Sequence, residues 1–287
     1  MSATLVQVIV GGLLLGAIYA LFSSGLTLIW GMMNVVNFAH GDFVMVAMYI
    51  AYVVYVLLGG GPLASVPIAA VSLATIGILA YFLLVRHVMR GPMIAQILGT
   101  FGLALLLRYS MFGAAGANFL SLPDNLVGGT YEIFGIRLQA SRVVAGIVAL
   151  LVTAGLHLLL TRTSLGSKML AVSEDATAAQ LMGIRPDYMQ AIAWGIAAGA
   201  TGIAGALIAT FFYISPTVGE TLAIIAFVTV ALGGFGSVPG ALVAGLLIGL
   251  IESLSAYWIG GVWKDVVVYI LFIFVLWFRP QGLMGKS

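Results

Sequence analysis

Cysteine is absent from the sequence, and charged side chains are scarce, making up 7% of 287 residues. Without cysteine the chain forms no disulfide bond and offers no thiolate for catalysis or metal binding. The scarcity of charge excludes a water-soluble globule, because 62% of the residues are hydrophobic and a soluble domain of this length needs a polar surface. The formal net charge of +2 gives no basis for an acidic partner such as nucleic acid.

Lipid is therefore the expected solvent of most side chains, and runs of about 20 apolar residues cross a bilayer as helices. Candidate spans, separated by glycine, proline or charge, are 5–30, 35–58, 64–86, 93–112, 142–161, 190–212, 221–234, 238–258 and 265–279. Counts of eight or ten stay open, because 221–234 is short and the first two runs meet in a polar segment. We predict an all-α polytopic membrane protein, a bundle of about nine transmembrane helices with broken or re-entrant elements. Residues 1–287 are expected to form a single domain.

Basic residues indicate the orientation, since cytoplasmic loops carry an excess of lysine and arginine. A cytoplasmic C-terminus places most of the basic loop residues inside: Arg86, Arg90, Arg162, Lys168, Arg185, Arg279 and Lys286. Arg137, Arg142 and Lys264 then lie outside, together with the N-terminal tail. The long polar loop 162–190 becomes cytoplasmic and the loop 113–141 external. Alternation from Tyr131 to Leu138 is typical of a small hairpin in the external loop.

Four polar residues interrupt the first two apolar runs: Asn34, Asn37, His40 and Asp42. Such groups near lipid cost several kcal/mol unless they find partners or water, so we expect them to line a protein interior or the translocation path. A cytoplasmic turn with a capping aspartate and a solvated histidine would explain the same residues. A zinc site is not expected, because one histidine and one aspartate lack the further ligands that zinc requires.

A second break lies at 233–240, where Gly233, Gly234, Gly236 and Pro239 prevent a continuous helix and allow close backbone approach. Glycine-interrupted elements in transporters are typical of the translocation path. A tight interhelical turn is the alternative interpretation. The lysine and the spacing of a phosphate-binding P-loop are missing.

The loop 162–190 contains a segment with the features of a short amphipathic helix. We expect Ser173 to cap it, Glu174 and Asp175 to occupy its first turn, and Gly183 to end it. Its apolar side chains would form an exposed knob that fits a groove on a cytoplasmic partner. These side chains belong to Ala178, Ala179, Leu181 and Met182. A solvated loop helix without a partner would show the same pattern.

Glu252 is the deepest of the few charged residues near the outer boundary. Intramembrane charges are often functional, so Glu252 is a candidate for the translocation path, with structural pairing as the alternative. Arg108, Glu220 and the neighbours Lys264 and Asp265 are explained by snorkelling or local pairing.

Motifs along nearly the whole chain carry a resemblance to a known family. They are Tyr19-Ala-Leu21, Gly25-Leu-Thr-Leu-Ile-Trp-Gly31, Asn37-Phe-Ala-His-Gly-Asp42, Thr163-Ser-Leu-Gly166, Leu181-Met-Gly-Ile184, Gly233-Gly-Phe-Gly-Ser-Val-Pro-Gly240 and Arg279-Pro-Gln-Gly-Leu283. In these motifs the sequence resembles the permeases of high-affinity branched-chain amino-acid (LIV-type) ABC importers. Segment 61–160 carries the least of the resemblance.

The resemblance implies a permease subunit that carries branched-chain amino acids across the bacterial inner membrane and has no catalytic residue, metal or cofactor of its own. It implies a second related permease chain, cytoplasmic ABC ATPases and a periplasmic solute-binding protein as partners. The family's coupling element would map onto Glu174 to Gly183. The chain has no Walker motif, which fits a subunit whose partners hydrolyse ATP. Urea or short amides are the alternative solutes.

Two other function classes compete with this interpretation. An ion-coupled secondary transporter would need ionisable groups deep in the spans, and apart from Glu252 those positions are nearly bare. An intramembrane enzyme built on His40 and Asp42 would need a nucleophile or a metal set beside them, and the sequence supplies neither.

Overall fold

The structure is a computed structural model that describes residues 3–59, 61–123, 128–133, 136–279 and 281–285. Lys286, which the orientation argument places in the cytoplasm, lies outside these residues. The elements are α1 (Ala3–Met33), α2 (His40–Leu58), α3 (Pro62–Ala80), the π-helical turn η1 (Tyr81–Val85), α4 (Arg86–Val88), α5 (Met93–Ala115), β1 (Thr130–Ile133), β2 (Ile136–Gln139), α6 (Ala140–Arg162), α7 (Ser164–Glu174), α8 (Ala176–Leu181), α9 (Pro186–Ile208), α10 (Val218–Gly233), α11 (Val238–Trp258) and α12 (Lys264–Phe278).

Seven of the described helices are long and apolar enough to cross a membrane, counting α3, η1 and α4 as one continuous span. They are α1, α2, α3 to α4, α5, α6, α9 and α11. The apolar runs 221–234 and 265–279 form α10 and α12, of 16 and 15 residues. At a rise of ~1.5 Å per residue these helices fall short of a hydrocarbon core of about 30 Å. The all-α polytopic fold is therefore confirmed, whereas the count of about nine transmembrane helices is not.

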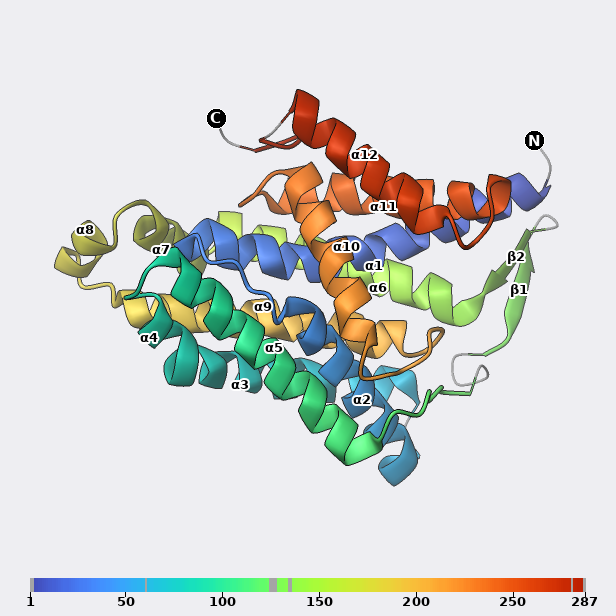
Figure 1. Cartoon of the computed structure of the whole chain (residues 1–287), viewed down its shortest axis with the longest axis horizontal. Helices are drawn as coiled ribbons and strands as arrows, with labels where there is room; N and C mark the ends of the chain where they lie inside the picture. The colour runs from blue at the N-terminus through green and yellow to red at the C-terminus, as the bar shows by residue number, and fades with distance from the viewer. Residues whose placement is uncertain (1–2, 60, 124–127, 134–135, 280, 286–287) are drawn as a thin grey trace.

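The first helix lies at the centre of the bundle. In Figure 1, α1 runs along the long axis of the molecule with α11 beside it, and α9, α6 and α10 also pack against α1. The helices α7 and α8 lie at one end of this axis, which we call the coupling end (Figure 1). The β1–β2 pair lies at the other, which we call the hairpin end. The two polar loops of the sequence therefore mark opposite ends of the bundle.

Glycine brings α1 and α11 together. The four-residue spacing of Gly12 with Gly16, and of Gly245 with Gly249, predicts close helix packing. The structure places the two pairs face to face. A Cβ on Gly12 would lie 2.8 Å from the carbonyl oxygen of Gly249, and a Cβ on Gly16 would lie 2.8 Å from Cα of Leu246. No larger side chain fits this seam without moving a helix, so the seam fixes the position of α1 along α11.

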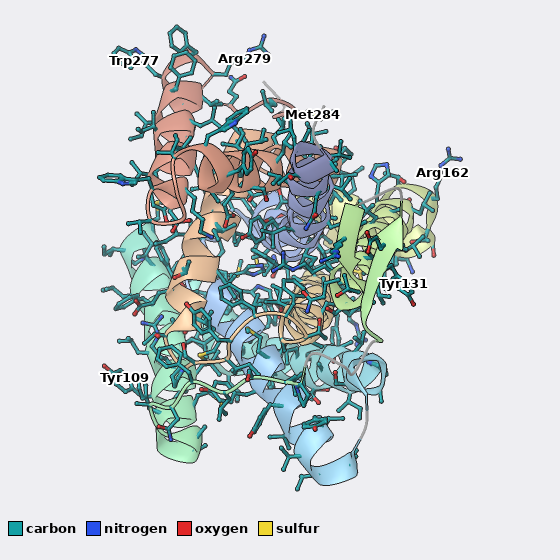
Figure 2. The ribbon with its side chains drawn as sticks, turned by 90° about the vertical axis from the view of Figure 1, so that its right-hand side faces the viewer. Tyr109, Tyr131, Arg162, Trp277, Arg279 and Met284 are labelled. Carbon is teal, nitrogen blue, oxygen red and sulfur yellow. The ribbon has the colours of Figure 1, made fainter. Side chains whose placement is uncertain are left out.

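The predicted hairpin is present in the external loop. β1 and β2 pair antiparallel from Thr130 with Gln139 to Ile133 with Ile136. Around the bundle the surface is apolar: Figure 2 looks along the long axis and shows Tyr109 and Trp277 pointing outward, and both side chains are largely exposed. Exposed aromatic and aliphatic side chains on such apolar helices suit contact with lipid.

Candidate translocation site and coupling segment

The first polar break places the start of α2 inside the bundle. α1 ends at Met33, Asn34 takes a left-handed φ of 53°, and residues 34–39 run back beside α1. His40 Nε2 then donates a hydrogen bond of 2.7 Å to the carbonyl oxygen of Phe22, and Asn37 Oδ1 accepts 3.1 Å from the backbone N–H of Ala39. A cytoplasmic turn with a solvated histidine is therefore the wrong interpretation for His40, which is buried, although Asn34 is exposed.

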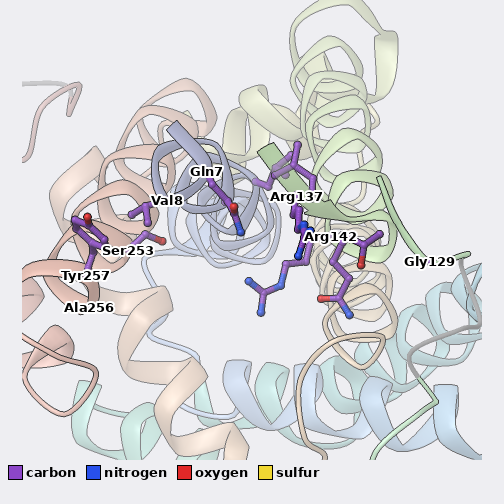
Figure 3. A pocket seen from close by; sticks show the side chains of 13 residues that line it. Gln7, Val8, Gly129, Arg137, Arg142, Ser253, Ala256 and Tyr257 are labelled. Carbon is purple, nitrogen blue, oxygen red and sulfur yellow. The ribbon is translucent and has the colours of Figure 1, made fainter. Parts of the chain in front are cut away.

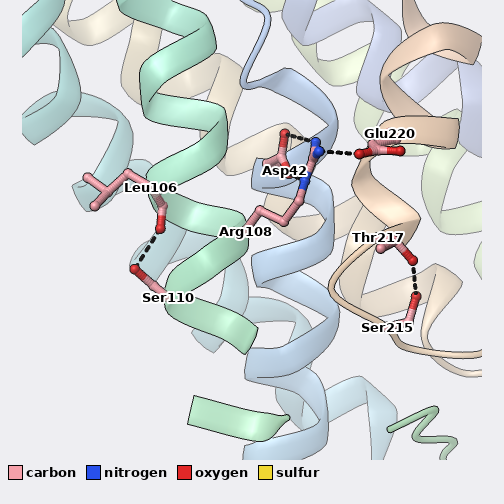
Figure 4. A network of polar contacts seen from close by, with 7 residues as sticks. All are labelled: Asp42, Leu106, Arg108, Ser110, Ser215, Thr217 and Glu220. Atoms are coloured by element: carbon pink, nitrogen blue, oxygen red, sulfur yellow. Dashed lines mark hydrogen bonds and ion pairs between the residues drawn. The ribbon is translucent and has the colours of Figure 1, made fainter. Parts of the chain in front are cut away.

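Asp42 closes an ionic network that joins three helices (Figure 4). Arg108 of α5 donates from Nε to Asp42 Oδ1 at 3.1 Å and from a terminal nitrogen to Oδ2 at 3.2 Å. The other terminal nitrogen of Arg108 pairs with Glu220 of α10. Asp42 is 1% exposed and Glu220 58% exposed, so the network runs from the interior to the surface. The pairing expected for Arg108 and Glu220 thus exists, and its centre is a residue of the first break.

The second break is a tight turn between α10 and α11. Gly234 and Gly236 have φ values of +100° and +79°, which residues with a Cβ rarely adopt. The backbone N–H of Gly236 donates 2.9 Å to Thr27 Oγ1 of α1. Ser237 caps α11 by accepting a hydrogen bond from the N–H of Gly240, and Pro239 lies in the first turn of that helix. Residues 233–240 therefore form a tight interhelical turn, which was the alternative interpretation of this segment.

The segment 281–285 packs on this turn. The N–H of Leu283 donates 2.8 Å to the carbonyl oxygen of Leu232, and the N–H of Met284 donates 3.0 Å to that of Gly233. Carbonyl groups in the last turn of a helix have no partner within the helix. The segment therefore completes the hydrogen bonding at the end of α10.

The two breaks lie at opposite ends of α10 and do not form one site. Near the start of α10, Gly41 and Gly219 bring the backbones of α2 and α10 into contact. At the other end the chain turns at Gly233. None of Asn34, Asn37 and the turn residues lines either of the two cavities described below.

Glu252 is held by partners from two other helices. Tyr19 of α1 donates its hydroxyl to Glu252 Oε2 at 2.8 Å, and Lys264 of α12 pairs with Oε1. Glu252 is buried, so these partners offset much of the cost of removing its charge from water. Structural pairing, the alternative to a path residue, therefore describes its contacts.

Two cavities open beside this group. One, of about 780 Å³, lies at the hairpin end between α1, α11 and β2. Figure 3 shows Gln7, Arg137, Arg142 and Tyr257 around it. The second, of about 520 Å³, is bordered by α1, α10 and α11 and reaches Glu252 and Lys264. Gly11, Leu14, Arg142, Ser253 and Ala256 line both, so the two cavities adjoin.

The coupling segment differs from its prediction in where the helix begins. Asp175, not Ser173, is the cap: Asp175 Oδ1 accepts hydrogen bonds from the N–H groups of Thr177 and Ala178, at 2.8 and 2.9 Å. The hydroxyl of Ser173 donates instead to the carbonyl oxygen of Leu170. Aspartate is as good a cap as serine, and here its neighbour Glu174 completes the preceding helix, α7.

The apolar knob is smaller than predicted. Leu181 and Met182 are 85% and 83% exposed, and Ala178 is also exposed. Ala179, however, is 4% exposed, because it packs in a cluster with residues of α1, α7 and α9. Gly183, with φ of +82°, follows the end of α8 as predicted.

Sequence reasoning missed several residues around the cavities. Tyr19 was part of a motif, but nothing in the sequence indicated that it would meet Glu252. Arg142 and Asp265 were assigned only to the outer boundary. The sequence contained one signal, because residues of opposite charge were expected at the same outer boundary of the membrane. Their helices are far apart in sequence, however, so the packing that brings them together was not predictable.

Comparison with known proteins gives the family. A family model described as "Branched-chain amino acid transport system / permease component" matches residues 8–276. The chain belongs to this family. The permease is 32% identical over 293 residues to the high-affinity branched-chain amino acid transport system permease protein BraD of Pseudomonas aeruginosa, covering 98% of this chain and 95% of BraD.

Two further relatives extend the comparison. LivH of Escherichia coli K12, a protein of the same description, is 29% identical over 98% of this permease and 95% of its own length. A probable branched-chain amino acid transport permease protein, LivH of Methanocaldococcus jannaschii, is 28% identical over 97% of this permease and 92% of its own length. No solved structure is significantly similar to the permease. The permease is thus a multi-pass membrane protein and a transport subunit, not an enzyme.

Proposed function

We propose that this permease is the membrane-spanning subunit of an ABC importer that moves branched-chain amino acids across the bacterial inner membrane. The proposal rests on the match to branched-chain amino acid transport permeases over nearly the full length of the chain. Urea or short amides are the alternative solutes. The same reasoning gives the permease three partners: a second related permease chain, cytoplasmic ABC ATPases and a periplasmic solute-binding protein.

The coupling end supplies the contact with the ATPase. α8 projects Leu181 and Met182 into solvent, while Ala179 anchors the helix to the bundle. An exposed apolar tip on a firmly held helix suits insertion into a groove of a partner. In this proposal Glu174, Asp175 and Gly183 shape the segment and Ala178 and Leu181 make the contact. The coupling end and the C-terminus then face the cytoplasm, and the hairpin end faces the binding protein.

The helix α10 is the proposed moving element. It is short, and Thr221 and Ile225 on one of its faces line the 520 Å³ cavity. At its start it is joined to α2 and α5 through Asp42 and Arg108, and at its end the glycine turn allows a change of direction. We assign the breaks Asn37 to Asp42 and Gly233 to Gly240 as the pivots of α10. Movement of α8 by the ATPase would shift the bundle between outward-open and inward-open states.

Purification of the tagged permease from its native membranes tests the proposal. A second permease and ATPases should copurify, and ATP hydrolysis should rise when leucine-loaded binding protein is added. Stimulation by urea-loaded and not by leucine-loaded binding protein would give the alternative solute. A lone chain without ATPases would contradict the importer and favour an ion-coupled secondary transporter.

A further inference from the structure

The cavity beside Glu252 is lined by more charged residues than helix packing requires. Its volume of about 520 Å³ lies within the range of small-molecule sites, which is about 300 to 1,000 Å³. It adjoins the larger cavity at the hairpin end, with which it shares lining residues. Four charged residues line it: Arg142, Glu252, Lys264 and Asp265.

Two of these four charged residues form an ion pair with each other, and the other two do not. Glu252 and Lys264 neutralise each other, and Tyr19 donates to the second oxygen of Glu252. Arg142 and Asp265 form no hydrogen bond or ion pair with any residue in the described part of the chain. Arg142 instead stacks over the ring of Phe211, with its guanidinium carbon 5.4 Å from the ring centre. The cavity therefore offers one cation and one anion that form no ion pair with each other, and Asp265 also interacts electrostatically with Lys264.

The rest of the lining is mostly apolar, with aliphatic side chains on α1 and α10 and aromatic side chains at 211–213. Leu15 and Ile18 come from α1, and Leu222 and Ile225 from α10. Apolar walls with a few convergent polar groups are the usual form of a small-molecule site, in which the polar groups set orientation and the walls bind the apolar part.

We propose that this cavity is an amino-acid subsite, in which Arg142 binds the α-carboxylate, Asp265 binds the α-ammonium group, and the aliphatic wall binds a branched side chain. Arginine binds a carboxylate through two parallel hydrogen bonds, and an ammonium group donates readily to a carboxylate. Glu252, Lys264 and Tyr19 position the site by holding α1, α11 and α12 together. The inference rests on the proposed function for the solute delivered, but the recognition chemistry stands on the cavity alone.

The charges also separate the two solute classes. A zwitterion satisfies Arg142 and Asp265 at once without adding net charge. Urea and short amides are neutral, so they would form no charge-assisted pair with either residue. They would also leave the aliphatic wall unfilled. The cavity therefore favours an apolar amino acid over urea.

The absence of cysteine makes a direct test possible, because a single introduced cysteine is the only thiol in the permease. Ala256→Cys places a thiol in the lining of both cavities, and Val262→Cys, at an exposed position between α11 and α12 that lines neither, is the matched control. Open membrane sheets carrying the full-length permease are treated with a charged methanethiosulfonate. The rate of labelling is followed with added L-leucine, leucinamide, 4-methylpentanoate or urea.

L-leucine should slow labelling of Ala256→Cys and leave Val262→Cys unchanged. Leucinamide, which lacks the carboxylate, and 4-methylpentanoate, which lacks the ammonium group, should protect poorly, and urea not at all. In Arg142→Gln and Asp265→Asn the half-protective concentration of leucine should rise about tenfold or more, as expected when a charge-assisted hydrogen bond is lost. Unchanged labelling of Ala256→Cys without added solute in these variants shows that the lining of the cavity is intact.

Absence of protection by leucine would overturn the subsite. Equal protection by leucinamide or 4-methylpentanoate would overturn the assigned charges, and protection by urea would overturn the preference for a zwitterion. These comparisons need no ATPase and no binding protein. If leucine protects the thiol but loaded binding protein does not stimulate ATP hydrolysis, the importer is overturned and the subsite stands. If ATP hydrolysis is stimulated but leucine gives no protection, the subsite is overturned and the importer stands.

Discussion

Nε2 of His40 lies 2.7 Å from the carbonyl oxygen of Phe22, so α2 begins beside the middle of α1 and not beyond its end. Residues 34–39 must run back along α1 to reach this point. Irregular backbone at membrane depth is tolerated only where protein or water surrounds it. Here Thr100 of α5 donates a hydrogen bond to the carbonyl oxygen of Val36, and Phe227 of α10 packs on Phe38. A short polar motif thus determines where a span begins.

Replacing His40 with leucine should destabilise the permease by about 1 kcal/mol, the net contribution of one hydrogen bond. His40→Gln keeps a donor and should lose less. Thermal unfolding of the purified permease in detergent measures both. Equal losses would show that the histidine acts through its packing and not through its hydrogen bond to Phe22.

Replacing Arg108 with methionine should cost far more, about 3 to 5 kcal/mol, because the buried carboxylate of Asp42 is left without a partner. Adding Asp42→Asn to this variant should restore part of the loss, since no unpaired charge remains. The same unfolding measurement gives the coupling between the two positions.

Glu220→Gln is the matched control in that series, because Glu220 meets the same arginine but is exposed. Its effect should be small. A loss as large as that of Arg108→Met would contradict the central place of Asp42 in the network.

The glycine seam predicts a strong positional effect. Gly16→Ala should destabilise by about 1 to 3 kcal/mol, because the new methyl group meets backbone of α11 and the helices must move apart. Gly155→Ala, in α6, places the same methyl group where no atom lies within 4 Å. If both variants unfold at the same temperature as the unsubstituted permease, close approach of α1 and α11 is not needed for stability.

The coupling segment is tested best at Leu181. Leu181→Arg should leave the permease folded and inserted but abolish most stimulation of ATP hydrolysis by loaded binding protein, because a charge replaces the apolar tip. Gln180→Arg adds the same charge at a neighbouring exposed position and should keep stimulation. Loss of stimulation in both would point to charge and not to the apolar contact. Ala179→Arg is unsuitable, since Ala179 is buried and the variant would disturb the fold.

Much of the fold was predictable because lipid imposes simple rules. Each apolar run of the sequence overlaps a described helix, although α2 begins only at His40 and α9 ends at Ile208, and the hairpin lies where alternation placed it. The number of spans was not predictable in the same way. The sequence marks 221–234 as short and predicts the glycine break after it. The contacts of this break with α1 and with segment 281–285 are long-range, so no local pattern predicts them.

The candidate site was predictable only in part, because its contacts are long-range. Residue type indicated that Asp42 and Glu252 needed partners, but not that these would be Arg108 and Tyr19. The prediction that Ser173 caps α8 was wrong for a local reason. Ser173 and Asp175 are both good caps, and Asp175 is the cap because α7 continues to Glu174. The prediction that Ala179 is exposed was wrong, because small residues occur both at surfaces and in tight packing.

The seam between α1 and α11 also sets an order of events during biosynthesis. Tyr19 and Glu252, which join the two helices by a hydrogen bond, are 233 residues apart in the chain. At translation rates of about 5 to 20 residues per second, α1 waits roughly 10 to 50 seconds in the bilayer before its partner helix emerges. During that interval the glycine groove of α1 faces lipid or an insertion factor. The centre of the bundle is therefore the first part to be made and among the last to be completed.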